Sequence, residues 1–588
     1  MNLQLRIQQL FHQALAGMVP DPTPYSTMVR AAQDPKFGDY QANCAMSLAK
    51  VLGKPPRVVA QDIVQRLDCG EMLDKPEIAG PGFINLRLNS AWLAKELQRN
   101  ARGDRLGVEP AQPAKTIVID FSSPNVAKPM HVGHLRSTII GDALTRLYRF
   151  LGHRVITDNH LGDWGTQFGI ILYGYKHFRD EAALKADFVR EMTRLYIHVR
   201  NLMKDEDVEN ANNPIAEAAR QETAKLHAGD PENLRLWQSF MPWCRQEIDA
   251  VYERLDVHFD HTLGESFYNP MLAEVVKSLL EKAIAQESEG AVAIFFGEND
   301  TPALVRKKDG AFTYTTTDLA TIRYRVETWN PDAILYLVDA RQALHFQHLF
   351  DAARRWGYDR VQLEHVAFGS VLAPDRKPIK TREGGAIELT ALLDEAIQHG
   401  ANRYDRTRQE RVERGEEVPE ISPEEKRQIA EIVGLGAVKY ADLSQNRTSD
   451  YIFSWEKMLA MDGNTATYMQ YAYARNRSIF RRGGDDPQTF RTAPPLPTLE
   501  HPHERALGRE LIRFEEALAA AAVDHKPSAI TSYLWDLAKS YSGFFENCPV
   551  LKAESPELRR SRLLMCDLTA RTIQKALELL GIRTVEQI

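Results

Sequence analysis

Between residues 116 and 368, short strand-like runs alternate with helical patterns, and this alternation limits the chain to a small set of folds. The runs are Thr116–Phe121, Val155–Thr157, Ala333–Val338 and His365–Phe368. Because helical patterns separate them, they predict β-α-β units and a parallel sheet. A polar, helix-rich stretch from about 180 to 290 interrupts the pattern and is predicted to be an insertion. We therefore expect an α/β domain over residues 113–455.

Segments of different character flank this α/β region. Residues 1–112 open with an amphipathic helical pattern and contain a strand-like run at 82–87, which predicts a small α+β domain. After about residue 456 the strand-like runs stop and long helical patterns follow, which predicts an all-α bundle over 456–588. A chain of 588 residues is too long for one core and long enough for these three domains.

The composition excludes several classes of protein. The five cysteines are scattered without a C-x-x-C pair, so we expect a cytoplasmic protein with neither a disulfide framework nor a structural metal site. No apolar run is long enough to cross a bilayer, and no membrane partner is expected. The net charge of −7 argues against general affinity for nucleic acid, although a local basic track would still permit it.

The most informative motif follows the first strand-like run, in the segment Ser123 to His134. A strand, a tight turn and a helix N-terminus make an anion site, because unpaired N–H groups and the helix dipole face one point. His131, His134 and Lys128 add side-chain donors there, and Gly133 allows a phosphate or flat ring to approach the backbone. This layout suits a nucleoside triphosphate. A core histidine pair is the plainer alternative, and a metal pair lacks an acidic third ligand nearby.

The segment His131 to His134 resembles the His-x-Gly-His signature of class I aminoacyl-tRNA synthetases, and the longer string Phe121 to Thr138 resembles the arginyl-tRNA synthetases. Residues 37–43 and 78–88 are similar to the N-terminal domain of that family, and residues 468–482 to the first helix of its anticodon-binding bundle. The resemblance implies a Rossmann-like catalytic domain with a helical insertion. It also implies an α+β N-terminal domain that meets the tRNA elbow, and an all-α C-terminal anticodon-binding domain.

The same resemblance implies an arginine–tRNA ligase. Such an enzyme forms arginyl-adenylate from ATP and passes arginine to the 2′-hydroxyl of the terminal adenosine of its tRNA. Its partners would be ATP with Mg²⁺, L-arginine and arginine-specific tRNA, and the family is usually monomeric. Two alternatives stay open: an amino-acid ligase of this fold acting on a small molecule, and a non-catalytic tRNA-binding paralogue.

The resemblance assigns catalysis to His131, His134 and Lys128, which would stabilise charge on the phosphates of ATP together with Gly133. The usual second motif, Lys-Met-Ser-Lys-Ser, is replaced here by the divergent segment 377–385. Lys380 and Arg382 in that segment are further candidate ATP ligands. Charge compensation therefore stays open among Lys128, Lys380 and Arg382, with Lys128 favoured.

Arginine recognition calls for carboxylates, because a guanidinium is planar and always charged. Tyr314 and Asp318 lie four residues apart, which places them on one face of a predicted helix. Without the family, such a pair would more often be an ordinary helix-surface pair. The resemblance implies arginine binding by five residues, namely Asp120, Asn125, Tyr314, Asp318 and Gln342.

Aromatic residues interleave with arginines from 468 to 482, a mixture that suits stacked bases and phosphates. With the family resemblance, the candidate tRNA contacts are Phe37, Tyr40, Asn43, Arg475, Arg477, Arg481 and Tyr541. Core packing is an equal or stronger alternative for Phe37, Tyr40, Tyr541 and also Phe545.

Overall fold

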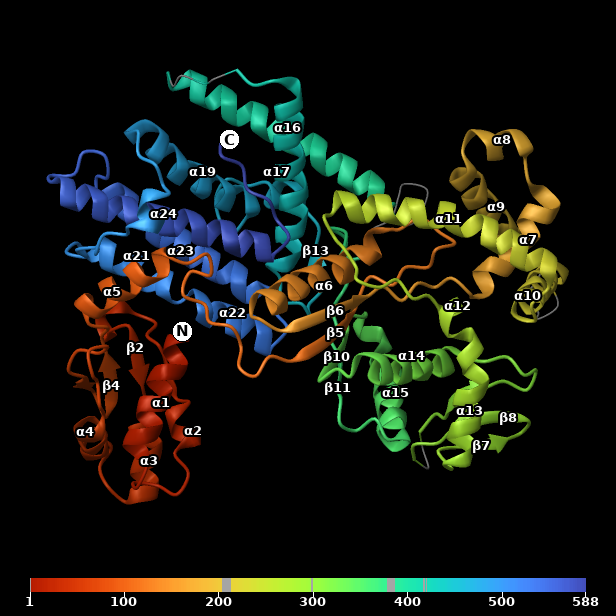
Figure 1. The fold of residues 1–588 in the computed structure, drawn as a ribbon, viewed down its shortest axis with the longest axis horizontal. Coiled ribbons are helices and arrows are strands. Elements are labelled where there is room, and N and C mark those ends of the chain that lie inside the picture. Colours follow the sequence, from red (N-terminus) through yellow and green to blue (C-terminus); the bar gives the residue numbers. More distant parts are fainter. Residues whose placement is uncertain are drawn as a thin grey trace. The chain divides into compact units, whose positions relative to one another are not determined.

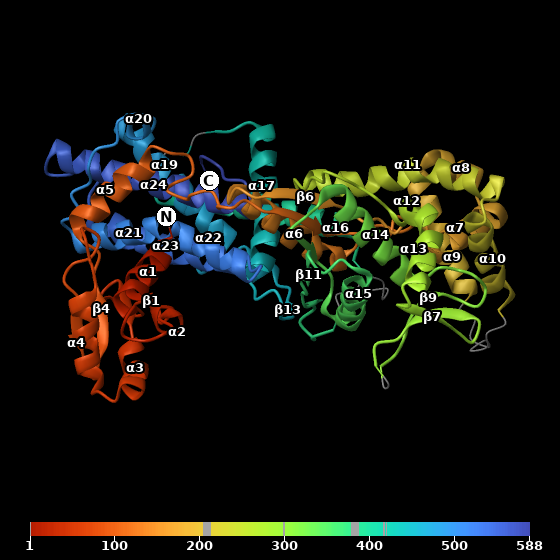
Figure 2. The ribbon, with the colours of Figure 1, turned by 60° about the horizontal axis from the view of Figure 1, so that its bottom comes forward.

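The structure is a computed structural model that describes residues 2–203, 213–297, 300–377, 387–415, 418 and 420–587. The chain divides into two compact units (Figures 1 and 2). The first unit contains Met1–Pro110, Gly400–Ser444 and Glu456–Ile588. The second contains Ala111–His399 and Gln445–Trp455.

The second unit is built around a parallel four-stranded sheet in the order β11-β10-β5-β6. Its strands are β5 (Thr116–Asp120), β6 (Arg154–Asp158), β10 (Ala333–Tyr336) and β11 (Gln362–His365). This confirms the predicted parallel sheet. The strand predicted at 365–368 lies at 362–365 instead, because β11 is an edge strand whose polar and apolar residues alternate without an apolar run.

The second unit also contains a series of helices. They are α6 (Val132–Phe150), α7 (Thr166–Phe178), α8 (Glu181–Ala186), α9 (Phe188–Leu202), α10 (Pro214–His227), α11 (Pro231–Arg254), α12 (Glu265–Tyr268), α13 (Leu272–Glu281), α14 (Tyr314–Trp329) and α15 (Ala343–Trp356). An antiparallel sheet of β7 (Ala285–Ser288), β8 (Ala291–Ile294) and β9 (Ala303–Arg306) lies between α13 and α14 along the chain. Between β12 (Val371–Leu372) and β13 (Tyr451–Ile452) the pairing is parallel.

The core of the second unit fixes how α14 and α15 approach the sheet. Val118 of β5 and Ile334 of β10 are fully buried and pack in one cluster with Leu319 of α14 and Leu349 of α15. Helices α14 and α15 contact each other directly (Figure 1). Each fully buried aliphatic side chain contributes about 2 kcal/mol of transfer free energy. This packing holds the beginnings of α14 and α15 near the carboxyl ends of the strands.

The first unit combines an antiparallel sheet with helices at the N-terminal end of the chain, as predicted. The sheet has the order β1-β2-β4-β3, with strands β1 (Val29–Ala31), β2 (Tyr40–Ala42), β3 (Glu77–Ala79) and β4 (Phe83–Leu86). The accompanying helices are α1 (Leu3–Leu15), α2 (Thr23–Ser26), α3 (Cys44–Leu52), α4 (Pro56–Arg66) and α5 (Ser90–Ala101).

The remainder of the first unit is helical, which confirms the predicted all-α bundle. Its helices are α17 (Pro423–Leu443), α19 (Ala466–Gly483), α20 (Thr489–Thr492), α21 (Pro502–Ile512), α22 (Phe514–Val523), α23 (Ser528–Asn547) and α24 (Pro556–Leu579), while α16 (Leu389–Glu413) and α18 (Trp455–Met458) contribute to both units. Leu534 of α23 and Leu564 of α24 are fully buried.

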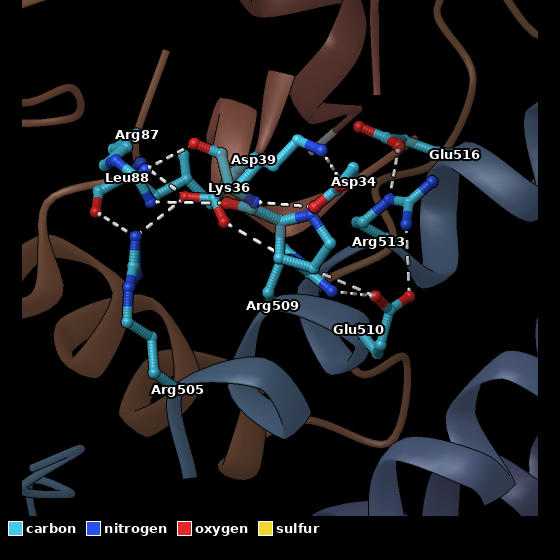
Figure 3. Close-up of polar contacts among 11 residues, drawn as sticks. Asp34, Lys36, Asp39, Arg87, Leu88, Arg505, Arg509, Glu510, Arg513 and Glu516 are labelled. Atoms are coloured by element: carbon cyan, nitrogen blue, oxygen red, sulfur yellow. Dashed lines mark hydrogen bonds and ion pairs between the residues drawn. The ribbon is translucent and has the colours of Figure 1, made fainter. Parts of the chain in front are cut away.

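Within the first unit, a network of acids and arginines joins the N-terminal sheet to the bundle (Figure 3). Asp39 accepts hydrogen bonds from the backbone N–H of Leu88 at 2.7 Å and from Arg505 of α21 at 2.8 Å. The hydroxyl of Tyr40 donates to Glu516 of α22 at 2.5 Å. Two of these hydrogen bonds come from partners more than 400 residues away, so the N-terminal sheet and the bundle pack as one body.

Candidate active site

The carboxyl ends of three parallel strands form the base of the site. Asp120 at the end of β5 is the register partner of Asp158 in β6 and of Tyr336 in β10. Ligands of open α/β sheets bind beyond this edge of the sheet. The loop that leaves β5 ends at His131, and the other three residues of the His-x-Gly-His motif form the first turn of α6.

The two histidines of the motif cap the N-terminus of α6. The Nδ1 atom of His131 accepts a hydrogen bond from the N–H of Gly133 at 3.0 Å, and Nδ1 of His134 accepts one from the N–H of His131 at 3.1 Å. This is a reciprocal capping box in which imidazoles replace the usual hydroxyl and carboxylate. The ring centroids lie 4.1 Å apart. Because each Nδ1 accepts, a neutral ring carries its proton on Nε2, which remains a donor.

Burial keeps both rings neutral. It lowers the pKa of His134 to about 4, with the charge of His131 as a second cause. The pKa of His131 is also lowered, first by burial and then by the positive charge of Lys128. Near pH 7 the motif therefore presents neutral Nε2–H donors instead of imidazolium ions.

Gly133 is required by the ring of His131. A Cβ atom at this position would lie 2.7 Å from Cε1 and 2.9 Å from Nδ1 of His131, closer than such contacts normally allow. The capping geometry thus explains the glycine between the two histidines. The sequence-based reason for Gly133, close approach of a ligand to the backbone, remains a prediction.

The lowered pKa of His134 predicts a pH dependence of stability. Because the folded-state pKa of about 4 lies below the unfolded value of about 6.5, the neutral ring contributes its full stability above pH 6.5 and loses it as the pH falls toward 4. Between pH 7 and pH 5 this amounts to about 2 kcal/mol of unfolding free energy. Urea denaturation of the wild type and of His134→Asn at both pH values should show that the variant lacks this decrement; equal decrements would contradict the expectation.

Lys128 lies beside the helical insertion. Its ammonium is 5.1 Å from the ring centroid of Tyr196 in α9, a cation–π contact, and Arg200 donates to the Tyr196 hydroxyl at 3.3 Å. Since Lys128 also lowers the pKa of His131, its charge acts on the histidine motif. Lys380 and Arg382 lie outside the described residues.

The candidate arginine ligands on α14 and α15 lie close together. Oδ2 of Asp318 is 2.7 Å from Nε2 of His345, and the Tyr314 ring meets the His345 ring edge-on at 4.9 Å between centroids. Tyr314 is 68% exposed and free to contact a ligand. Gln342, also exposed, is the N-cap residue of α15, three residues before His345.

Asp120 is held differently from the sequence-based expectation. Arg325 of α14 is fully buried and donates to Oδ2 of Asp120 at 2.7 Å and to Oδ2 of Asp158 at 2.9 Å. Oδ1 of Asp120 accepts from the hydroxyl of Ser123 at 2.9 Å. Asp120 and Asp158 therefore share the single guanidinium of Arg325, and the three groups together keep one negative charge. The ion pair fixes α14 against the sheet, and the predicted contact of Asp120 with substrate arginine stays a prediction.

Asn125 shapes its own loop, since its Oδ1 accepts from the N–H of Ala127 at 3.1 Å. The loop is tied to the turn after β6 by a bridge between Asn125 and Gly162. A Cβ at Gly162 would come within 3.2 Å of the Asn125 amide nitrogen. The predicted contact of Asn125 with the α-amino or carboxylate group of arginine stays a prediction.

Two of the candidate tRNA contacts are buried. Tyr40 has no exposed surface and Tyr541 is 1% exposed, so neither ring can stack on a base in this conformation. We revise both to core residues, in agreement with the alternative stated above. The family resemblance suggested the contacts, and the burial of both rings favours the core-packing alternative.

The other candidate tRNA contacts remain accessible. Phe37 is 39% exposed, and Asn43 lies exposed at the N-cap of α3. Arg475 lies over the rings of Tyr471 at 4.9 Å and Phe545 at 5.1 Å. Arg477 and Arg481 of the same helix pair with Glu586 at 3.1 Å and 3.6 Å.

Comparison with known proteins identifies the family of the chain. Profiles of three domain families match the chain: the class I tRNA synthetase (R) catalytic domain over residues 99–455, the arginyl tRNA synthetase N terminal domain over 5–88, and the DALR anticodon binding domain over 469–588. The chain belongs to the class I arginyl-tRNA synthetase family. The resemblance that residues 121–138 carried is confirmed.

Individual relatives agree with this assignment over their whole length. Arginine–tRNA ligases of Rhodopirellula baltica and Klebsiella pneumoniae are 42% and 44% identical to the chain, with 100% of each chain covered. The crystal structure of arginyl-tRNA synthetase from Plasmodium falciparum matches with a TM-score of 0.83 at 28% identity, covering 100% of this chain and 99% of that one. The Thermus thermophilus arginyl-tRNA synthetase matches with a TM-score of 0.80 at 25% identity and full coverage of both.

The described part of the chain lacks two further kinds of feature. There, no three histidine, cysteine or acidic side chains gather in a way that could hold a metal ion. Nor does any described helix combine the length and the apolar character needed to cross a bilayer.

Three residues of the site were missed by sequence reasoning. His345 follows the predicted ligand Gln342 by three positions, a spacing that puts both on one face of a helix, and this signal was available. Arg325 and Tyr196 gave no such signal, because their partners lie far away in the sequence.

Proposed function

We propose that this chain, an arginine–tRNA ligase, activates arginine at the carboxyl ends of its parallel strands, with His131, His134 and Lys128 on the phosphates of ATP. The observation that carries this proposal is the imidazole capping box at the start of α6. It supplies two Nε2–H donors beside a helix N-terminus, where anions are favoured. The positive charge of Lys128 acts on His131 of the same capping box.

The first step needs no general base. An ionised carboxylate oxygen of arginine attacks the α-phosphorus of ATP, a P–O bond forms, and the bond to the pyrophosphate oxygen breaks. Negative charge shifts onto the phosphoryl oxygens and the departing pyrophosphate during this displacement. Donors that are already in place stabilise this charge more than the ground state, and this difference accelerates the reaction.

Asp318 holds the guanidinium of arginine, at the end opposite the reacting carboxylate. Oδ2 of this carboxylate is occupied by His345, and the described residues offer no hydrogen-bond partner to Oδ1, which is directed to a guanidinium in this proposal. Tyr314 and Gln342 complete the pocket from the exposed beginnings of α14 and α15. Asn125 binds the α-amino or carboxylate group of arginine.

The second step transfers arginine to tRNA. The 2′-hydroxyl oxygen of the terminal adenosine attacks the carbonyl carbon of arginyl-adenylate and forms an ester bond. The bond from that carbon to the phosphate oxygen breaks, AMP leaves, and the hydroxyl proton passes to the phosphate or to water. Phe37, Asn43, Arg475, Arg477 and Arg481 serve as tRNA contacts of the first unit. Mg²⁺ accompanies the triphosphate and is held mainly by phosphate oxygens and water. The enzyme works in the cytoplasm as a monomer.

Discrimination against lysine tests this function. A pocket built for a planar guanidinium leaves paired acceptors unsatisfied when a compact ammonium enters, and such losses reach about 10⁴-fold in kcat/KM. Aminoacylation of total tRNA should therefore be at least about 1,000-fold more efficient with arginine than with lysine. Lysine charging within tenfold of arginine charging would contradict the proposed pocket.

A further inference from the structure

His345 lies at the centre of the proposed arginine pocket although it has no assigned role. Its Nε2 atom is 2.7 Å from Oδ2 of Asp318, and its ring packs edge-on against Tyr314. The side chain is only 17% exposed, compared with 26% for Asp318. One imidazole thus contacts two of the proposed arginine ligands.

We propose that His345 is a positioning residue that orients the Asp318 carboxylate for the guanidinium of arginine. This inference rests on the proposed arginine site. A carboxylate on a short side chain can rotate about two torsions, and each unfixed rotor must be ordered when the ligand binds. The hydrogen bond from Nε2–H to Oδ2 fixes both torsions before arginine arrives and leaves Oδ1 for the ligand.

The location of His345 supports a positioning role over simple packing between helices. It lies in the first turn of α15, three residues after Gln342, and therefore on the same face as another proposed ligand. The Asp318 carboxylate has no second hydrogen-bond partner within the described residues. Loss of His345 would consequently leave the Asp318 carboxylate free to rotate.

Two substitutions separate the hydrogen bond from the ring contact. His345→Phe keeps an aromatic ring against Tyr314 but removes the donor to Asp318. His345→Gln places an amide nitrogen where Nε2 lies and so retains the donor. His348→Phe is the matched control, because His348 is on the same helix but stacks on Phe296 at 4.1 Å.

We expect His345→Phe to raise the KM for arginine about tenfold, with kcat and the KM values for ATP and tRNA within about twofold of wild type. His345→Gln should restore the KM for arginine to within about threefold, and His348→Phe should match wild type. An unchanged KM for arginine in His345→Phe would overturn the inference. So would equal increases in all three KM values, because these indicate a general structural defect.

The variant Asp318→Asn separates this inference from the proposed function. If His345 acts through Asp318, the double variant Asp318→Asn/His345→Phe should have the same KM for arginine as Asp318→Asn alone. If Asp318→Asn itself leaves that KM unchanged, the proposed arginine site is wrong. If it raises the KM and His345→Phe does not, only the role of His345 is wrong. Should His345→Phe fail to fold, His345→Gln with a tenfold higher KM would still overturn the inference.

Discussion

The variant Asp318→Asn is expected to have a KM for arginine about 100-fold above the wild-type value. The change removes the negative charge and keeps the size of the side chain, so a charge-assisted hydrogen bond to the guanidinium is lost. Removing one partner of such a pair costs about 3 kcal/mol, or about 100-fold in affinity. Steady-state pyrophosphate exchange and aminoacylation, with arginine varied at saturating ATP and tRNA, measure this effect.

The control for this prediction is Asp309→Asn, a matched substitution at an exposed aspartate that accepts from the N–H of Ala311 in the turn before α14. It should leave all kinetic constants unchanged. The KM for ATP should stay near the wild-type value in both variants, because Asp318 has no proposed contact with the nucleotide. A KM for arginine within threefold of wild type in Asp318→Asn would remove Asp318 from the site.

The variant His134→Asn is expected to lower kcat about 100-fold. An asparagine oxygen can replace Nδ1 of His134 as the acceptor of the His131 N–H, so the helix cap is retained while the Nε2 donor is lost. Loss of one donor to the developing charge costs about 3 kcal/mol of transition-state stabilisation. Single-turnover formation of arginyl-adenylate measures the chemical step directly.

The complementary variant His134→Gln tests the division of labour between the two ring nitrogens. Its amide nitrogen reaches the position of Nε2 and should restore part of the rate, whereas the cap is weakened and the free energy of unfolding falls. The reverse order, with His134→Gln slower than His134→Asn, would assign the function of the ring to Nδ1 and contradict the proposed donor role.

The sheet and the helix that follows its first strand were predictable from the sequence. The β-branched run from Thr116 and the apolar spacing after His134 gave β5 and α6 because both are local patterns. The prediction placed edge strand β11 three residues too far along the chain, because a half-exposed strand has no apolar run to mark it. Local periodicity thus predicts buried elements better than edges.

The residues of the site were predictable where local geometry decides and were missed where distant packing decides. The histidine motif was recognisable as a local signature after a strand and a turn, whereas Tyr314 and Asp318 were assigned by the family resemblance, since their spacing alone favours an ordinary helix-surface pair. The pairing of Asp120 with Arg325 joins residues 205 positions apart, and no local pattern in the sequence indicates it. Tyr40 and Tyr541 are buried by elements far away in the chain, which no neighbouring sequence reveals.

A crystal structure of the enzyme with bound arginine tests the central claim most directly, because it locates the guanidinium. The account predicts guanidinium nitrogens within about 3 Å of Oδ1 of Asp318, with His345 still on Oδ2 and Arg325 still paired with Asp120. A guanidinium bound to Asp120 with Arg325 displaced, and Asp318 without contact to the ligand, would contradict it.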